Sequence, residues 1–69
     1  MMKLKDAVKL AVKTDNLSML NQCANQMRYQ LGMDYENSVA FISRHTGLSA
    51  DDIEDLFYNM DKAEERGEI

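Results

Sequence analysis

The chain has 69 residues, a net charge of −4, one cysteine, and neither proline nor tryptophan. A chain this short forms one domain with a modest hydrophobic core and leaves no space for a deep enclosed pocket. A lone cysteine excludes an intrachain disulfide and suits a reducing compartment, and no apolar run of about 20 residues is present to cross a membrane. We therefore expect a cytoplasmic protein without a membrane-spanning segment.

Charge is distributed unevenly along this chain. Residues 1–31 carry five basic and two acidic side chains, for a net charge of +3, whereas residues 51–69 carry eight acidic and two basic ones, for a net charge of −6. Such asymmetry influences the choice of partner and the rate of association more than it influences the fold.

The first predicted helix spans residues 2–13. Its apolar residues recur at helical spacing, at Leu4, Ala7, Val8 and Ala11. On the other side, a basic ridge recurs every four residues, at Lys5, Lys9 and Lys13. The pattern predicts an amphipathic helix with one buried and one basic side.

The second predicted helix spans residues 16–31. Its buried face is expected to hold Leu17, Leu20, Cys23, Ala24, Met27 and Leu31. The opposite face is polar but uncharged around Gln22, Gln26 and Tyr29, and low charge beside an aromatic residue is typical of an interface. We expect this face to contact a protein partner or a second copy of the chain. Gly32 is expected to end the helix.

The third and fourth helices are predicted at residues 35–45 and 50–65. Asp34 can cap the third helix, which is expected to bury Tyr35, Val39 and Ile42. Ser49 can cap the fourth helix, where an apolar stripe comprises Ile53, Leu56, Phe57 and Met60. The sequence thus predicts an all-α fold of about four short helices, with one domain over residues 1–66 and a C-terminal tail over residues 67–69.

Residues 41–56 carry a local motif at the junction of the last two helices. Its key positions are Ser43, Gly47, Leu48, Ile53 and Leu56. This arrangement of a small residue, a turn glycine and three apolar residues resembles the helix-turn-helix of bacterial and phage regulators, without pointing to a specific family. The resemblance implies that the last two helices form a helix-turn-helix-like corner.

The exposed positions of the fourth helix differ from those of a DNA reader. They are Asp51, Asp52, Glu54, Asp55 and Tyr58. Four carboxylates would meet the phosphate charge of DNA without a compensating base, so we do not expect this helix to enter a DNA groove. Two interpretations stay open: the acids keep the protein soluble, or they dock on a basic partner surface of the kind found in nucleic-acid-binding proteins.

DNA binding remains the alternative hypothesis. A dimeric helix-turn-helix regulator could place Lys5, Lys9, Lys13 and Arg44 against phosphates. Three lysines on one helix are few for this purpose, since about six to ten phosphate contacts are typical of a strong site.

Catalytic and metal-binding motifs are missing from the sequence. His45 is the only histidine, Cys23 has no base beside it in the chain, and no phosphate loop or nucleophile motif is present. We expect no enzyme activity, no metal and no cofactor. The function we predict is a small regulatory or inhibitory protein that binds another protein, and self-association remains open.

Overall fold

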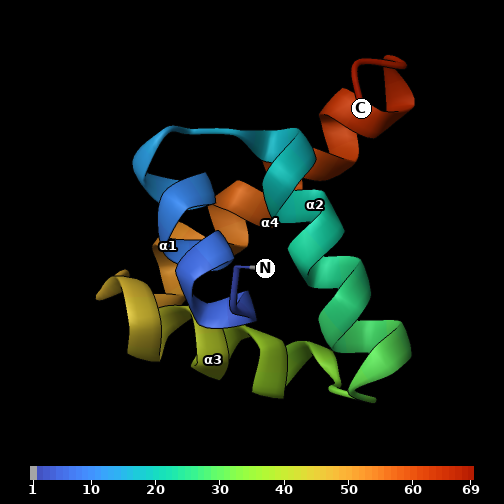
Figure 1. Cartoon of the computed structure of the whole chain (residues 1–69). Helices are drawn as coiled ribbons and strands as arrows, with labels where there is room; N and C mark the ends of the chain where they lie inside the picture. Colours follow the sequence, from blue (N-terminus) through green and yellow to red (C-terminus); the bar gives the residue numbers. More distant parts are fainter. Residues whose placement is uncertain (1) are drawn as a thin grey trace.

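Four α-helices and one π-helical turn make up residues 2–69, which the computed structural model describes (Figure 1). In chain order they are α1 (Leu4–Lys13), α2 (Leu17–Asn25), η1 (Gln26–Gln30), α3 (Tyr35–Thr46) and α4 (Ala50–Glu65). Residues 2–69 contain no strand, and the predicted all-α fold is confirmed. Met1, which the predicted domain includes, lies outside the described residues.

Helices α2 and α3 each contact both α1 and α4. Helix α1 packs against α2 and α3, and α4 packs against the same two helices, behind α1 in the view of Figure 1. The apolar stripes of α2 and α4 face the core, so the remaining sides of these two helices lie on the outer surface of the molecule.

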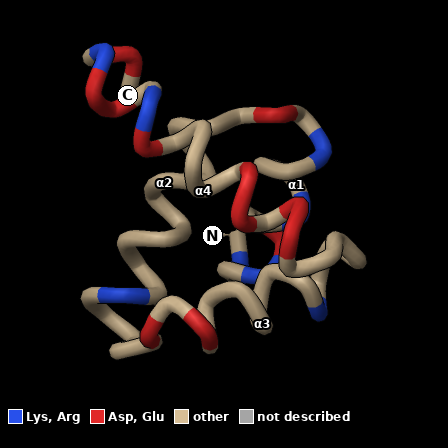
Figure 2. Tube along the Cα trace, turned by 180° about the vertical axis from the view of Figure 1, so that it is seen from behind, with Lys and Arg blue, Asp and Glu red and all other residues tan. Residues whose placement is uncertain are grey.

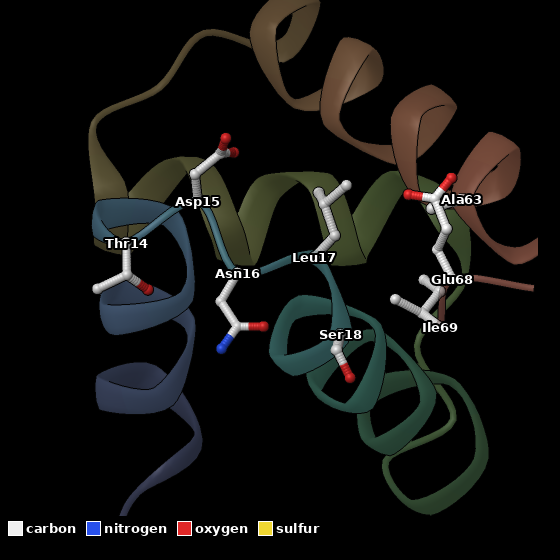
Figure 3. A pocket seen from close by; sticks show the side chains of 8 residues that line it. All are labelled: Thr14, Asp15, Asn16, Leu17, Ser18, Ala63, Glu68 and Ile69. Atoms are coloured by element: carbon white, nitrogen blue, oxygen red, sulfur yellow. The ribbon is translucent and has the colours of Figure 1, made fainter.

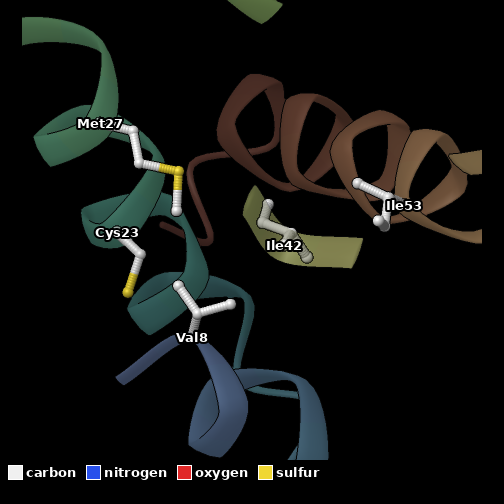
Figure 4. Packing of buried hydrophobic residues seen from close by; sticks show 5 residues of the cluster. All are labelled: Val8, Cys23, Met27, Ile42 and Ile53. Carbon is white, nitrogen blue, oxygen red and sulfur yellow. The ribbon is translucent and has the colours of Figure 1, made fainter. Parts of the chain in front are cut away.

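All four α-helices and η1 contribute to the core. One buried cluster comprises Val8, Cys23, Met27, Ile42 and Ile53, whose side chains converge in Figure 4. A second cluster comprises Ala11, Leu20 and Met60. These residues lie on the stripes that helical periodicity predicts, so hydrophobic burial accounts for how the helices face one another.

Local side-chain bonds determine where the helices begin. Asp34 accepts a hydrogen bond from the backbone N–H of Asn37, at 2.8 Å, and Ser49 accepts one from Asp52, at 3.2 Å. Each bond satisfies a backbone donor that the first helical turn leaves unpaired. The two predicted caps are confirmed.

The connection between α3 and α4 is held by its turn glycine and by a serine. Gly47 has a φ of 77°, a left-handed conformation that glycine adopts without a steric penalty. The hydroxyl of Ser43 donates to the carbonyl of Leu48 at 2.8 Å, which ties the last turn of α3 to the connection. These contacts define a tight helical corner, and its kinship with helix-turn-helix regulators stays a prediction.

Leu31 was expected on the buried face of the second helix, and this expectation is wrong, because its side chain is 54% exposed. The π-helical turn η1 explains the difference. In η1 the N–H of Leu31 donates to the carbonyl of Gln26, five residues earlier, at 3.1 Å. This turn holds one residue more than an α-helical turn and shifts the register, so the stripe that includes Met27 no longer reaches Leu31.

Tyr35 was also expected to be buried, and it is 58% exposed. It is the first residue of α3, where the chain has just turned away from η1. Its ring does not enter the core but lies on the ring of Phe57 in α4, with 5.6 Å between ring centroids. More than half of the tyrosine stays open to solvent in this contact.

Candidate protein-binding cleft

A cleft of about 560 Å³ lies beside the contact between α2 and α4, and it is lined by residues of α2, η1 and α4 and by residues from the 33–38 segment. From α2 and η1 it is lined by Asn21, Ala24, Asn25, Arg28 and Tyr29. Its other lining residues are Met33, Asp34, Tyr35 and Ser38, and then Phe57, Met60, Asp61 and Glu64 on α4. The cleft therefore lies between the two helices on which the sequence predicts protein-binding surfaces.

Three aromatic rings line this cleft. Tyr35 and Phe57 form the tilted pair described above, at an interplanar angle of 50°. Tyr29 is 72% exposed, and the guanidinium carbon of Arg28 lies 5.4 Å from its ring centroid. Large exposed rings are unusual on a protein of this size and are enriched where proteins bind one another.

The charged side chains of the cleft are mainly acidic. Asp34, Asp61 and Glu64 face a single base, Arg28. None of the four takes part in a salt bridge within residues 2–69, where the ion pairs are Lys62–Glu65 and Arg66–Glu68. Among these four residues, only Asp34 has a side chain that takes part in a hydrogen bond within residues 2–69, with the N–H that it caps. The carboxylates of Asp61 and Glu64 are thus available to a ligand, and the cleft attracts positive charge.

Ser38 is the one buried polar residue among residues 2–69, with 8% of its surface exposed, and it lines the cleft. Its hydroxyl takes part in no hydrogen bond within the described chain. The residues described contain no sealed side-chain N or O atom that lacks a hydrogen-bond partner, so the Ser38 oxygen is accessible to water. A ligand in the cleft can replace that water as a partner of the hydroxyl.

The predicted acidic residues of α4 are exposed but do not form one flat surface. At 100° per residue, Asp52 and Glu54 point about 160° apart around the helix axis, so one partner surface cannot contact both. Glu54 lies on the side of α4 that carries Asp61, about two turns before it. Acidic positions gather in the first turns of α4 and again towards its end (Figure 2).

Of the predicted residues on the second helix, the structure brings only Tyr29 into the cleft. Gln22 and Gln26 are exposed outside its lining, as is Tyr58, whose ring lies 5.5 Å from the ammonium nitrogen of Lys62. Met19 and Met33 are partly buried and pack against the core, so they do not add to a binding surface.

The residues of the DNA-binding alternative, which are Lys5, Lys9, Lys13 and Arg44, are all exposed. Within the described chain none of them forms an ion pair. Their basic side chains come from α1 and from the last turn of α3, so the alternative relies on two separate elements.

Sequence reasoning missed Arg28, Asp34, Ser38, Asp61 and Glu64 as members of one site. They come from η1, from the connection that follows it, from α3 and from α4, and no spacing in the sequence brings them together. One feature of the sequence could have indicated this site, namely the two tyrosines at positions 29 and 35 on either side of Gly32.

A second, shallow hollow lies between the α1–α2 connection and the C-terminus (Figure 3). The predicted tail returns onto the domain there, because Ile69 packs against the second core cluster. The N–H of Glu68 donates to the carbonyl of Ala63 at 2.8 Å and closes the end of α4. This hollow is open and lacks exposed aromatic rings.

Cys23 and His45 lie in different surroundings. Cys23 is a core residue, and burial raises the pKa of its thiol above the ordinary value of 9.0, which disfavours the reactive thiolate. His45 lies against Phe41, with 4.6 Å between ring centroids. Residues 2–69 contain no group of three or more His, Cys, Asp or Glu side chains that could hold a metal ion.

No helix formed by residues 2–69 combines the length and the apolar character needed to cross a membrane. Comparison of the chain with protein-family models, with curated proteins and with solved structures finds no match.

Proposed function

We propose that this chain is a non-enzymatic regulatory protein that binds another protein through the cleft between α2–η1 and α4. The observation that carries this proposal is the exposed aromatic lining of a cleft with excess negative charge. The partner surface it suits is basic, as on many nucleic-acid-binding proteins, so inhibition of such a protein falls within the proposal.

The energetics of the cleft support a protein partner. Aromatic side chains are frequent among the residues that dominate binding energy, because they remove a large area from water while immobilising few torsions. Tyr29 and Tyr35 are more than half exposed, so a partner that covers them buries apolar area not yet used by the fold. The carboxylates at 61 and 64 then favour partners with basic side chains.

DNA binding through the last helix has less support. The outward positions Asp51, Glu54 and Asp55 carry negative charge, and no lysine or arginine lies within the first ten residues of α4. Each carboxylate near a phosphate would oppose the counterion release that gives DNA binding its affinity.

The proposal is tested by affinity purification of the full chain from cells of its source organism. Two charge-reversed variants are compared, Asp61→Lys/Glu64→Lys in the cleft and Asp52→Lys/Asp55→Lys on the outer acidic surface, where both side chains are exposed and point at least about 120° away from Asp61 around the helix axis. We expect the unaltered chain and the outer variant to retain the same protein, and the cleft variant to lose it. Equal recovery by all three contradicts a role for the cleft, and recovery of DNA alone contradicts a protein partner.

A further inference from the structure

We infer that the cleft holds a single arginine side chain of the partner, a conclusion that rests on the function proposed above. Its guanidinium stacks on the Tyr35–Phe57 pair and donates to Asp61, Glu64 and Ser38. This inference names the group that the cleft recognises and therefore goes beyond attraction for basic surfaces.

The aromatic pair favours arginine over other cations. Tyr35 is 58% exposed, and its ring packs against that of Phe57 with 5.6 Å between the centroids, a contact that restricts the tyrosine ring. A planar guanidinium stacks on such a ring and is only weakly hydrated, whereas the ammonium group of lysine is compact and strongly hydrated. The protein itself makes this kind of contact at Arg28, which lies over Tyr29.

The polar groups of the cleft match the donors of a guanidinium. Asp61 and Glu64 are three residues apart on α4, on one side of the helix, and neither has a partner within residues 2–69. Ser38 lines the same cleft, and its hydroxyl oxygen can serve as a third acceptor. Arginine has five N–H donors in a fixed plane and can bond several acceptors at once, which lysine cannot do in the same geometry.

Arg28 limits the cleft to one cation. It comes from η1, on the wall opposite α4, and it has no carboxylate partner within residues 2–69. The positive charge of Arg28 would repel any further basic side chains of a ligand. The cleft is therefore suited to an arginine flanked by apolar residues rather than to a polybasic run.

The first test titrates the isotope-labelled full chain with capped Gly-Leu-Arg-Leu-Gly and follows backbone amide signals by NMR. Matched peptides replace arginine by lysine or by citrulline, which keeps the shape of arginine without its charge. We expect the arginine peptide to shift the signals of Tyr35, Ser38 and Asp61, and to bind about fivefold more tightly than the lysine peptide. Equal affinity for lysine, or for citrulline, overturns the inference.

The second test uses a matched pair of variants on α4. Asp61→Asn/Glu64→Gln removes two carboxylates from the cleft, and Asp52→Asn/Asp55→Asn removes two from the outer surface, with the same spacing along α4 and the same change in net charge. We expect the first variant to weaken the arginine peptide about tenfold and the second to leave its affinity within about twofold. A similar loss in both variants shows attraction by net charge only and overturns the inference.

Failure of this inference can be told apart from failure of the proposed function. If the cleft variant loses a protein partner in cells but the arginine peptide does not bind, the partner uses another group and only the inference is wrong. If the charge-reversed cleft variant retains every partner while the peptide still binds the cleft, the proposed function is wrong.

Discussion

The rings of Tyr35 and Phe57 lie 5.6 Å apart between centroids and are tilted by 50°. This contact joins the first residue of α3 to the middle of α4, two elements that otherwise meet through the core residues Ile42 and Ile53. It also forms the aromatic wall of the cleft. The same pair therefore contributes to stability and presents the surface to which we assign binding.

Replacing Tyr35 by alanine is expected to lower the free energy of unfolding by about 1 kcal/mol, because it removes an aromatic pair that is only partly buried. Tyr35→Phe keeps the ring and should change stability little. Tyr58→Ala is the matched control, since Tyr58 is similarly exposed and touches no core residue through its ring. Urea unfolding of the three variants measures the effect, and an equal loss for Tyr35→Ala and Tyr58→Ala contradicts it.

Two serines of α3 should respond differently to alanine. Ser43→Ala removes the bond from its hydroxyl to the carbonyl of Leu48 and should cost about 1 kcal/mol of unfolding free energy. Ser38→Ala removes a buried hydroxyl that has no partner within residues 2–69, so it should leave stability unchanged or raise it slightly. Chemical denaturation of both variants checks this contrast. A marked loss in Ser38→Ala would mean that its hydroxyl is bonded within the fold.

Gly47→Ala is expected to destabilise the corner between α3 and α4 by about 1–2 kcal/mol, because alanine pays a steric penalty at positive φ. No atom lies within 4 Å of the position that the added methyl group would take, so backbone conformation alone causes the loss. Gly47→Asn should recover part of it, since asparagine tolerates this conformation. Thermal unfolding tests the order Gly, Asn, Ala, and a different order rejects the explanation.

Cys23 should make stability fall in alkaline solution. Because burial raises the pKa of the folded thiol, the unfolded chain loses its proton first, near pH 9.0, and binds fewer protons than the folded chain above that pH. The stability that the protonated Cys23 thiol contributes is complete below pH 9.0 and is lost as the pH rises through the pKa of the folded thiol. Urea unfolding of Cys23→Ala should show a weaker decline of the unfolding free energy between about pH 7.5 and pH 10.5, a range that spans about one and a half units on either side of pH 9.0. If the unaltered chain and Cys23→Ala lose stability equally over this pH range, the assignment of the decline to the Cys23 thiol is contradicted.

Duplex DNA should not bind the chain with a dissociation constant tighter than about 100 µM at about 50 mM salt. The acidic outer positions of α4 oppose phosphate, and the basic ridge of α1 offers few contacts. Glu54→Lys/Asp55→Lys should raise the affinity, which fluorescence anisotropy can measure. Binding by the unaltered chain that weakens steeply with salt would instead support the helix-turn-helix regulator.

Local signals in the sequence account for most of the fold. The caps at Asp34 and Ser49 and the apolar stripe of α4 depend on neighbours within a few residues, and they lie where predicted. The register beyond Met27 could not be predicted, because the sequence carries no local motif that marks the π-helical turn at residues 26–30. Leu31 is exposed for that reason.

The candidate site was only partly predictable. The sequence identified Tyr29 and an acidic α4, but it favoured the first turns of α4 over Asp61 and Glu64. The cleft depends on how α2, η1 and α4 are placed relative to one another, a tertiary feature that follows from core packing. The burial of Ser38 beside the cleft likewise has no signature in the sequence, since serine is common on helix surfaces.

The most direct test of the central claim is photo-crosslinking from inside the cleft. A photoreactive phenylalanine analogue is placed at position 35 in the full chain, and in a matched variant at the exposed position 9 of α1, in cells of the source organism. We predict an adduct with one protein from position 35, lost in the Asp61→Lys/Glu64→Lys background, and no such adduct from position 9. Absence of an adduct at position 35, or the same adduct from both positions, contradicts the account.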